Sequence, residues 1–453
     1  MLDNIEVRLT DERIIPASGV SLVGHILDKS GFIERLNMMD ASGKRSHKQI
    51  KDGDILATFI ALECMGKPDY DAVRELLDDP EAYKSMLGIA SRIPSSPILR
   101  QRMDEIGSSK RTILLGENIK MFRANGVSPS RLPGGFVPVD IDVTPEDNSK
   151  TKKEGVSRTY KGCDGFAPMM AYIGTEGYLL DAELRPGSQH SQKGTPEFLR
   201  ECIPMARKLT NEPLMFRMDS GNDSVDNIGI FSETGCHYII KRNLRKESCE
   251  EWLSLAKSCC KDIKEPRDGK TVYIGSTWKD VRYSTESGDD VSTTVRIVYE
   301  ITERTIDKDG QYLFPSKIDV DTWWTNLPLS DREIIALYHA HGECEQYHSE
   351  IKTDMDLERL PSEKFATNEL VLELAIIAYN ILRMIGQETV GLKAGMPQHS
   401  VKRRRARTVI SNLVMMASHV TRHARKLVIG LGNSNFWRVP FLKVYNSFAQ
   451  FEA

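Results

Sequence analysis

Residues 137–144 alternate between apolar and polar side chains, and this period of two constrains the fold more than any other feature of the chain. Such alternation predicts a β-strand with one buried face. Two further strands are predicted at residues 168–173 and 178–184, because the turn Gly174-Thr-Glu-Gly177 separates two apolar runs. Three antiparallel strands therefore open a sheet near residue 137.

Helices and strands alternate in the segment that follows. The apolar spacing predicts a helix over residues 196–209, a strand over 214–218, a helix over 224–233 and a strand over 237–241. The order βββαβαβ, with one final helix still to come, is that of a ribonuclease-H-like mixed sheet flanked by helices. We therefore expect an α/β fold of this class.

A β-rich insertion delays the final helix, since residues 271–274, 293–302 and 311–314 are predicted to be strands. The helix is then predicted to begin after Ser330, because Ser330 and Glu333 have the spacing of a capping box. It extends toward residue 352, and a second long helix over residues 366–385 is expected to pack behind it.

These elements divide the chain into five parts. The first part is helical, and no helix in it is conspicuously basic, so binding of DNA ends and dimerisation are both open as its role. The parts are an N-terminal helical domain (1–128), the first part of the ribonuclease-H-like core (129–244), the β-rich insertion (245–328), the second part of the core (329–394) and a basic C-terminal region (395–453).

Charge is distributed unevenly along the 453 residues. The chain has 61 lysines and arginines against 64 aspartates and glutamates, yet 11 basic and no acidic residues lie between Glu388 and Glu452. A basic run is often only a solvated surface, but beside a site that acts on DNA it favours nucleic-acid binding. Arg403, Arg404 and Arg405 are therefore predicted to contact DNA phosphates without reading sequence.

Composition excludes several other classes of protein. The first twenty residues lack the basic start and apolar core of a secretory signal. The longest apolar run, residues 370–384, contains Glu373, Asn380 and Arg383, so no bilayer span is predicted. The eight cysteines form no C-x-x-C pair and show no zinc-type spacing, so we expect reduced thiols.

Three acids stand out by their positions. Asp142 lies on the first strand, Asp219 follows the strand over residues 214–218, and Glu345 lies within the final helix. Ligand sites collect at strand ends in open mixed sheets, so these three acids can converge. Their carboxylates would repel each other unless cations joined them, and hard oxygen ligands suit Mg²⁺ or Mn²⁺, a pair of which supports phosphoryl transfer on a nucleic acid. Each acid alone also fits an ordinary strand, turn or helix position.

The final helix carries chemically mixed residues on one face. Tyr338, His341, Glu345 and Lys352 lie at offsets of 0, 3, 7 and 14 residues, which places them on the same side of a regular helix. A core-facing stripe would be aliphatic, so an aromatic ring, an imidazole, an acid and a base together favour a functional face.

The spacing of these four residues resembles the Tyr-x2-Arg-x3-Glu-x6-Lys signature of bacterial insertion-sequence transposases with a DDE triad. Further segments, in the same order along the chain, are similar to motifs of the insertion-sequence family 1380 branch. They are Asp140-Ile-Asp142-Val-Thr144, Leu184-Arg-Pro-Gly187, Arg217-Met-Asp219-Ser-Gly221, Thr325-Asn-Leu327, Gly342-Glu-Cys-Glu345-Gln346 and Ala378-Tyr-Asn380. The resemblance covers residues 130–430, approximately, and implies a transposase.

The resemblance also implies roles for single residues. It makes the three acids the catalytic, metal-binding triad, with Asp142 preferred to Asp140 because the first acid of the family sits in an Asp-x-Thr context. It implies that Tyr338 and Lys352 hold the DNA backbone near the scissile phosphate. His341 stands where the signature has arginine, and we expect it near a phosphate, which would favour the protonated ring.

Trp323 and Trp324 lie just before the final helix. In relatives with a similar insertion, aromatic residues at this place stack on a flipped base, so the resemblance implies that Trp323 contacts DNA. The alternative is that the two rings close the core of the β-rich insertion.

We therefore expect an endonuclease that cleaves the ends of an insertion sequence and joins them to target DNA, with Mg²⁺ or Mn²⁺ as cofactor. Its partners would be double-stranded DNA, at the terminal inverted repeats and the target, and a second copy of the chain in the synaptic complex, but no membrane. The implied location is the bacterial cytoplasm, with the nucleoid when DNA is bound. The alternative is a catalytically silent, transposase-derived protein that binds DNA without cutting it.

Overall fold

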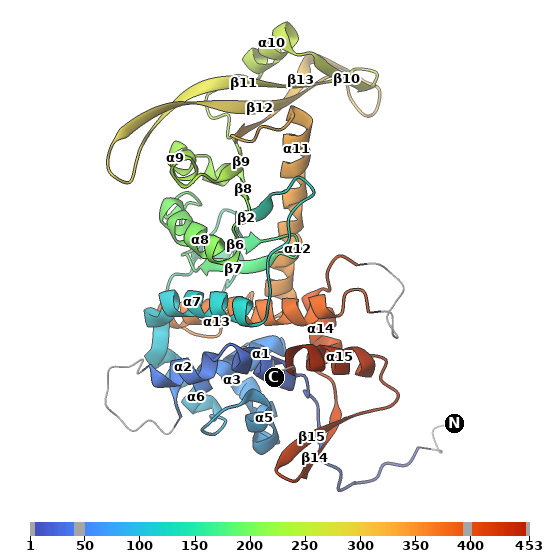
Figure 1. Ribbon diagram of the computed structural model, residues 1–453. Helices are drawn as coiled ribbons and strands as arrows, with labels where there is room; N and C mark the ends of the chain where they lie inside the picture. Colours follow the sequence, from blue (N-terminus) through green and yellow to red (C-terminus); the bar gives the residue numbers. More distant parts are fainter. Residues whose placement is uncertain (1–4, 40–49, 393–400, 450–453) are drawn as a thin grey trace. The chain divides into compact units, whose positions relative to one another are not determined.

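The computed structural model describes residues 5–39, 50–392 and 401–449. By its internal contacts the chain divides into two compact units (Figure 1). The sheet unit comprises residues 128–151 and 155–348, and the helical unit comprises residues 1–127, 152–154 and 349–453. The domain boundary that we expected between residues 394 and 395 lies outside the described residues.

The core of the sheet unit is a five-stranded ribonuclease-H-like arrangement. Strand β2 (Val137–Val143) pairs antiparallel with β6 (Met169–Ile173), which pairs antiparallel with β7 (Tyr178–Glu183). On its other edge β2 pairs parallel with β8 (Leu214–Met218), and β8 pairs parallel with β9 (His237–Lys241). The order β7-β6-β2-β8-β9 confirms the fold class that the sequence predicts.

Two helices accompany the parallel strands. Helix α8 (Thr195–Leu209) precedes β8, and α9 (Val225–Thr234) is the crossover from β8 to β9. Helix α9 begins where the Ser224 side chain accepts a hydrogen bond from the Asp226 N–H. It ends at Gly235, whose φ of 64° favours glycine.

The insertion extends the same sheet. Its strand β13 (Tyr312–Thr325) pairs antiparallel with β9, and β12 (Asp290–Ile306), β11 (Lys270–Ser284) and β10 (Asp262–Arg267) follow in turn. These strands are much longer than the sequence predicts. Polar residues interrupt the apolar pattern from which strand length is predicted. The backbone pairing of β11 with β12 nevertheless continues without a break from the pair Lys270–Arg304 to the pair Ser284–Asp290. Helix α10 (Cys249–Cys259) also belongs to the insertion.

The segment between β2 and β6, expected to be a polar loop, contains a small sheet. It consists of β3 (Glu146–Asp147), β5 (Asp164–Phe166) and β4 (Ser157–Arg158). Tyr160 lies in the turn between β4 and β5, and its hydroxyl donates to the Val143 carbonyl at 3.1 Å. The small sheet therefore lies beside the end of β2.

The helix that carries the third acid begins at the predicted capping box. The Ser330 hydroxyl accepts from the Glu333 N–H, and Glu333 accepts in return from the Ser330 N–H. The uninterrupted helix that we expected is wrong, however. Helix α11 (Asp331–His339) passes into a 3-10 turn, η4 (Ala340–Glu343), before α12 (Cys344–Ser349), so the offsets of a regular α-helix do not hold across this segment.

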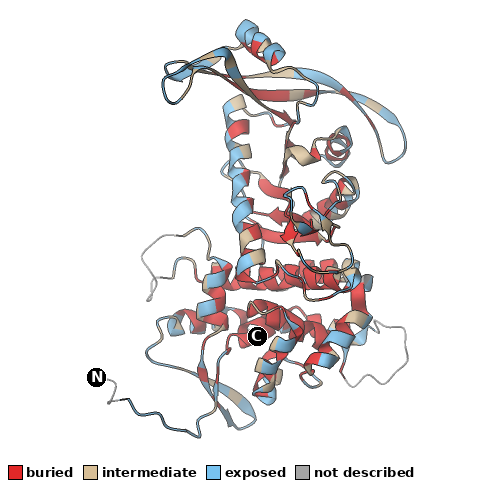
Figure 2. Cartoon of the chain, turned by 180° about the vertical axis from the view of Figure 1, so that it is seen from behind, coloured by how far each residue is buried: buried red, intermediate tan, exposed pale blue. Residues whose placement is uncertain are grey.

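The helical unit is built around α13 (Phe365–Glu388), which packs against α3 (Asp52–Cys64), α6 (Ser96–Ile106) and α7 (Arg111–Ala124). We expected α13 behind the helix that carries Glu345. The two helices belong to different units, and α13 forms the core of the helical unit, where it is buried on all sides from residue 370 to 386, as its red ribbon in Figure 2 shows. None of the helices in the described part of the chain is both long enough and apolar enough to cross a bilayer.

Shorter elements complete the helical unit. Its remaining helices are α1 (Val20–Lys29), α2 (Phe32–Met38), η1 (Tyr70–Val73), α4 (Arg74–Leu77), α5 (Pro80–Leu87), η2 (Gly107–Lys110), η5 (Glu350–Asp354), α14 (Ala406–Val409), η6 (Ile410–Val414) and α15 (Arg438–Ala449). A three-stranded sheet of β1 (Ile14–Ile15), β14 (Ser418–His423) and β15 (Lys426–Leu431) pairs the two ends of the sequence. The basic C-terminal region thus contains regular structure that its composition did not predict.

Candidate active site

The register of two parallel strands brings the first two acids together. Asp140 on β2 lies opposite Arg217 on β8, and Ile141 lies opposite Met218. Residues two apart on a strand share a face, so the next pair along is Asp142 and the residue just beyond β8, Asp219. The Asp-x-Asp and Arg-x-Asp motifs therefore meet at the carboxyl ends of two neighbouring strands.

Asp140 is occupied by a buried ion pair. Arg217 donates to its two oxygens from Nε at 2.5 Å and from Nη2 at 2.6 Å, and His341 Nδ1 lies 3.1 Å from Oδ1. Burial opposes ionisation of Asp140, but Arg217 and His341 outweigh it and lower the pKa of the carboxyl to about 2. The solvated strand face that alternation predicts for β2 is absent here, because this acid is covered by its partners.

Asp142 has a different environment. Its Oδ1 accepts from the Val143 N–H at 2.8 Å, and its Oδ2 lies 3.2 Å from His348 Nε2. Burial raises the pKa of Asp142, but the hydrogen bond and charge of His348 exceed that effect, so the net shift is downward. Asp142 is therefore ionised and half-buried, and it is held at both oxygens.

The ionisation of Asp219 is affected by the charge of Asp142. Its Oδ1 accepts from the Gly221 N–H at 3.1 Å and from Asn222 Nδ2 at 3.0 Å. The pKa of Asp219 is nevertheless raised, first by burial and then by the negative charge of Asp142. Such repulsion between carboxylates is what a shared cation would relieve.

Glu345 completes the group from α12, where its side chain is exposed. Burial and then the charges of Asp142, Asp219 and Glu345 raise the pKa of the Tyr160 hydroxyl, so all three acids lie close enough to act electrostatically on this one group. Within the described residues, no lysine or arginine forms an ion pair with any of the three. A set of three carboxylates without an arginine or lysine partner fits divalent cations with oxygen ligands.

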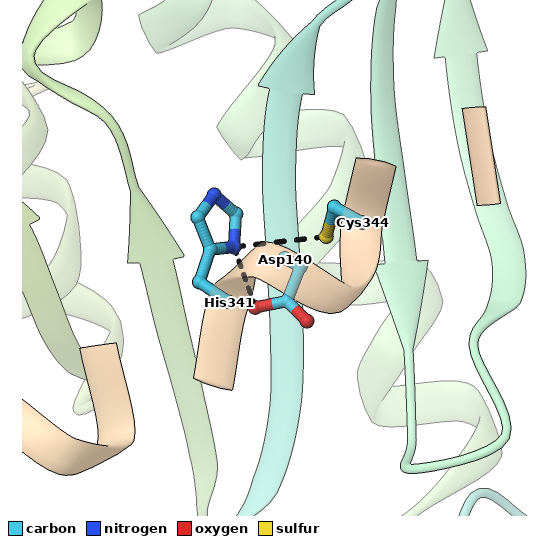
Figure 3. A group of neighbouring side chains, drawn as sticks. All are labelled: Asp140, His341 and Cys344. Carbon is cyan, nitrogen blue, oxygen red and sulfur yellow. Dashed lines mark hydrogen bonds and ion pairs between the residues drawn. The ribbon is translucent and has the colours of Figure 1, made fainter. Parts of the chain in front are cut away.

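A second group of side chains could in principle ligate a metal. Ligand atoms of Asp140, His341 and Cys344 lie within 4.8 Å of one another (Figure 3). Arg217 already occupies both oxygens of Asp140, and burial raises the pKa of the Cys344 thiol well above its usual value. A cation here would compete with a guanidinium and require a thiolate that burial disfavours, so the three-acid group is the better metal candidate.

Comparison with known proteins agrees with this geometry. A family model described as transposase DDE domain group 1 matches residues 2–453. The chain belongs to this family of DDE transposases. These are metal-dependent enzymes that cleave and join DNA, so the expected function and enzyme class are confirmed at the level of the family.

Structural comparison gives a weaker likeness. The synaptic complex of piggyBac transposase with hairpin DNA, solved by cryo-electron microscopy, is similar over 88% of this chain and 80% of that chain, at 10% identity and a TM-score of 0.41. No curated protein sequence matches the transposase significantly.

His341 and Tyr338, which were predicted to share a helix face with Glu345, differ in how far they are buried. His341 is 8% exposed, and its ring is turned to Asp140 rather than to solvent. Tyr338 is half-buried, with its ring centroid 5.6 Å from that of Trp323 and 6.0 Å from that of His341. Burial and then the charges of Asp219 and Asp142 raise the pKa of its hydroxyl.

Trp323 is in the core of the sheet unit, with 1% of its surface exposed. It packs with Val298, Leu327 and Ile334. This position fits the structural alternative, because a base could stack on the ring only after the strand had moved. Trp324 is 5% exposed, and its Nε1 donates to Asp223 Oδ1 at 2.8 Å.

The lysine and the arginines predicted to contact DNA lie in the helical unit, and most of them form ion pairs. Arg403 contacts buried Glu350 at 2.6 Å, and Arg405 contacts buried Asp354 at 2.7 Å. The guanidinium of Arg404 lies over the ring of Trp437, with 5.9 Å to its centroid. Lys352 lies 3.4 Å from Glu358. These contacts give the arginines structural partners that the composition of the tail did not reveal.

Four residues that the structure places at the site were assigned no role there from the sequence: Arg217, His348, Tyr160 and Tyr172. Arg217 and Asp219 share a strand face, which could have paired Arg217 with Asp140. His348 lies three residues after Glu345, one helical turn away, which could have marked it as a neighbour of the site. Tyr160 and Tyr172 had no local signal, because only the tertiary fold brings them to the acids.

Proposed function

We propose that the transposase cleaves the ends of its mobile element and joins them to target DNA at Asp142, Asp219 and Glu345. One observation carries this proposal: the parallel register of β2 and β8 brings Asp142 and Asp219 to neighbouring strand ends, where Asp142 raises the pKa of Asp219 and neither acid has a paired arginine or lysine among the described residues. Acids clustered in this way at the strand ends of the sheet are suited to metal-assisted phosphoryl transfer.

The three carboxylates would hold Mg²⁺ or Mn²⁺. When bound, such ions activate a water or 3′-hydroxyl and stabilise the leaving oxygen of a phosphodiester. The chain itself supplies fixed geometry. Arg217 and Asp140 lock β8 to β2 directly beside the two aspartates, and Asn222 holds Asp219. Asp140 is excluded as the first ligand in this proposal, because the Arg217 guanidinium already balances its charge and bonds both of its oxygens.

DNA contacts are proposed for the surroundings of the acids and for the helical unit. Tyr338 is assigned to the DNA near the scissile phosphate, and Lys352, Arg404 and Arg405 to the backbone elsewhere. Arg405 supports this best, because half of its side chain is exposed. His341 is assigned to the support of Asp140 instead, because it is 8% exposed and its ring contacts that carboxylate. The structure favours a mainly structural role for Arg403 and Trp323, which are 13% and 1% exposed.

The proposed partners are double-stranded DNA, at the terminal inverted repeats and the target site, and a second copy of the chain in a synaptic dimer. We propose membership of the insertion-sequence family 1380 branch on the motifs of the sequence, and a cytoplasmic location in association with the nucleoid. The helical domain at residues 1–128 would bind DNA ends or dimerise.

A cleavage assay tests the proposal. The purified chain is incubated with supercoiled DNA that carries the inverted repeats flanking its own gene, with Mg²⁺ or with EDTA. Cleavage at the ends that requires Mg²⁺ is the expected result. Tight binding to the same ends with no cleavage in Mg²⁺ or Mn²⁺ would instead establish the catalytically silent alternative.

A further inference from the structure

His348 contacts two strands of the sheet through its two ring nitrogens. Its Nε2 lies 3.2 Å from Asp142 Oδ2, and its Nδ1 lies 3.1 Å from the hydroxyl of Tyr172 on β6. The side chain of His348 is 4% exposed, and its ring meets that of Tyr172 edge-on at 5.4 Å between centroids. Solvent therefore does not compete for either nitrogen.

The tyrosine hydroxyl determines which nitrogen carries the proton. A hydroxyl that donates to Nδ1 leaves Nε2 as the N–H donor, and this nitrogen faces Asp142. Met170 Sδ also lies 3.2 Å from the Tyr172 hydroxyl, but a thioether is a weak acceptor, so His348 is the better acceptor for that proton. The Nε2 N–H of His348 can therefore donate to Asp142.

The carboxylate of Asp142 is then fixed at both oxygens. The Val143 N–H binds Oδ1 at 2.8 Å and His348 binds Oδ2, so rotation of the carboxylate would break one of the two bonds. Each carboxylate oxygen has a second acceptor site. Both oxygens of Asp142 therefore keep capacity for a metal ion. Asp140 differs, because Arg217 already balances its charge and His341 makes a second contact to its Oδ1.

One turn of α12 serves two of the three acids. Glu345 is exposed and His348 is buried, three residues apart on the same helix. The helix that presents the third acid thus also carries the group that fixes the first. A shift of this turn would disturb both acids together.

We propose that His348, held by Tyr172, is a positioning residue that orients the Asp142 carboxylate for metal binding. This inference rests on the proposed function, since it needs the three acids to bind an ion. Loss of an outer partner of a metal ligand typically weakens metal affinity by about 10- to 100-fold. The same is expected here when the Nε2 donor is lost.

The test measures Mn²⁺ binding to the full chain without DNA, by electron paramagnetic resonance of the free ion. His348→Leu keeps a side chain of similar bulk but removes the donor, and should bind Mn²⁺ about 10- to 100-fold more weakly. His348→Gln retains an N–H donor and should recover most of the affinity. Tyr172→Phe keeps the ring and should fall between them. His419→Leu, at an exposed position on β14, is the matched control and should bind as the wild type does.

The outcomes separate the positioning role from the metal site on which it depends. The proposal is wrong if a folded His348→Leu chain binds Mn²⁺ with wild-type affinity. It is also wrong if His348→Leu and His348→Gln lose Mn²⁺ affinity equally, because His348 would then act only by packing. If His348→Leu unfolds, Tyr172→Phe decides, because it should weaken Mn²⁺ binding at an unchanged unfolding temperature. If the wild type shows no Mn²⁺ binding that Asp219→Asn removes, the proposed metal site itself fails and the positioning role fails with it.

Discussion

Arg217 and Asp140 form a bidentate ion pair between β8 and β2, with both side chains no more than 5% exposed. The strands are parallel and in register at this pair. The acids two residues further along, Asp142 and Asp219, are consequently brought side by side at the strand ends. A structural ion pair thus fixes the distance between two of the proposed metal ligands.

Replacing Arg217 with methionine should destabilise the sheet unit strongly. The substitution leaves Asp140 charged and buried with only His341 beside it, and breaking a buried pair from one side costs about 3–5 kcal/mol. Urea unfolding measures the loss. The double variant Arg217→Met with Asp140→Leu should recover much of it, because it removes the stranded charge. A loss below about 1 kcal/mol in the single variant would show that the pair contributes little.

The stability of the transposase should depend on pH through His341. Burial lowers the pKa of His341, but the hydrogen bond to Asp140 and the charges of Asp140 and Asp142 outweigh it, so the net pKa is raised. A raised folded pKa gives stabilisation that is complete below the unfolded value of about 6.5 and is lost as the pH rises through the folded pKa. The free-energy difference between wild type and His341→Gln should therefore be larger near pH 5.5 than near pH 8.5. Parallel pH curves for the two chains would contradict this.

The arginines of the basic run should separate into two classes. Arg405→Ala with Arg407→Ala removes side chains that are 51% and 63% exposed, and should weaken binding to any DNA sequence. The slope of log affinity against log salt should become shallower by about 0.9 for each phosphate that the variant no longer neutralises. Arg403→Ala is the comparison, since its own side chain is only 13% exposed and its partner Glu350 is buried. It should cost about 1–3 kcal/mol of stability and leave the salt slope unchanged. An effect of the double variant on the element ends alone would identify a base-reading role.

Trp323 should act through stability more than through DNA. Truncating this buried ring to alanine should cost about 3–5 kcal/mol in urea unfolding. Trp323→Phe keeps most of the packing, and its rate of cleavage at element ends should stay close to that of the wild type. A Trp323→Phe chain that is stable yet loses cleavage would restore the base-stacking role that the resemblance implies.

The order of the core strands could be predicted because each is a short apolar run bounded by turn signals. Strands β8 and β9 fall at the predicted residues, and the capping box at Ser330 forms as its spacing indicates. Strands β11 and β12 include the predicted residues 271–274 and 293–302, but their full length could not be predicted, because the ladder extends by backbone pairing between polar segments.

The site was predictable only in part for the same physical reason. The three acids stand at strand ends and in a helix, where local patterns mark them. The side-chain partners of Asp140 and Asp142 come from distant elements, at sequence separations of 77, 201 and 206 residues. The burial of His341 also depends on the 3-10 turn at Ala340–Glu343, which shifts the helix face away from regular α-helical offsets.

The most direct test of the account compares Glu345→Gln with Glu343→Gln in DNA strand cleavage at the element ends in Mg²⁺. Both glutamates are exposed and lie two residues apart, so the second variant controls for the loss of a charge. Bound ions contribute several kcal/mol to the transition state, so Glu345→Gln should lower the cleavage rate by at least about 1,000-fold and retain binding to the ends. Glu343→Gln should cleave as the wild type does. Cleavage by Glu345→Gln at the wild-type rate would contradict the three-acid site.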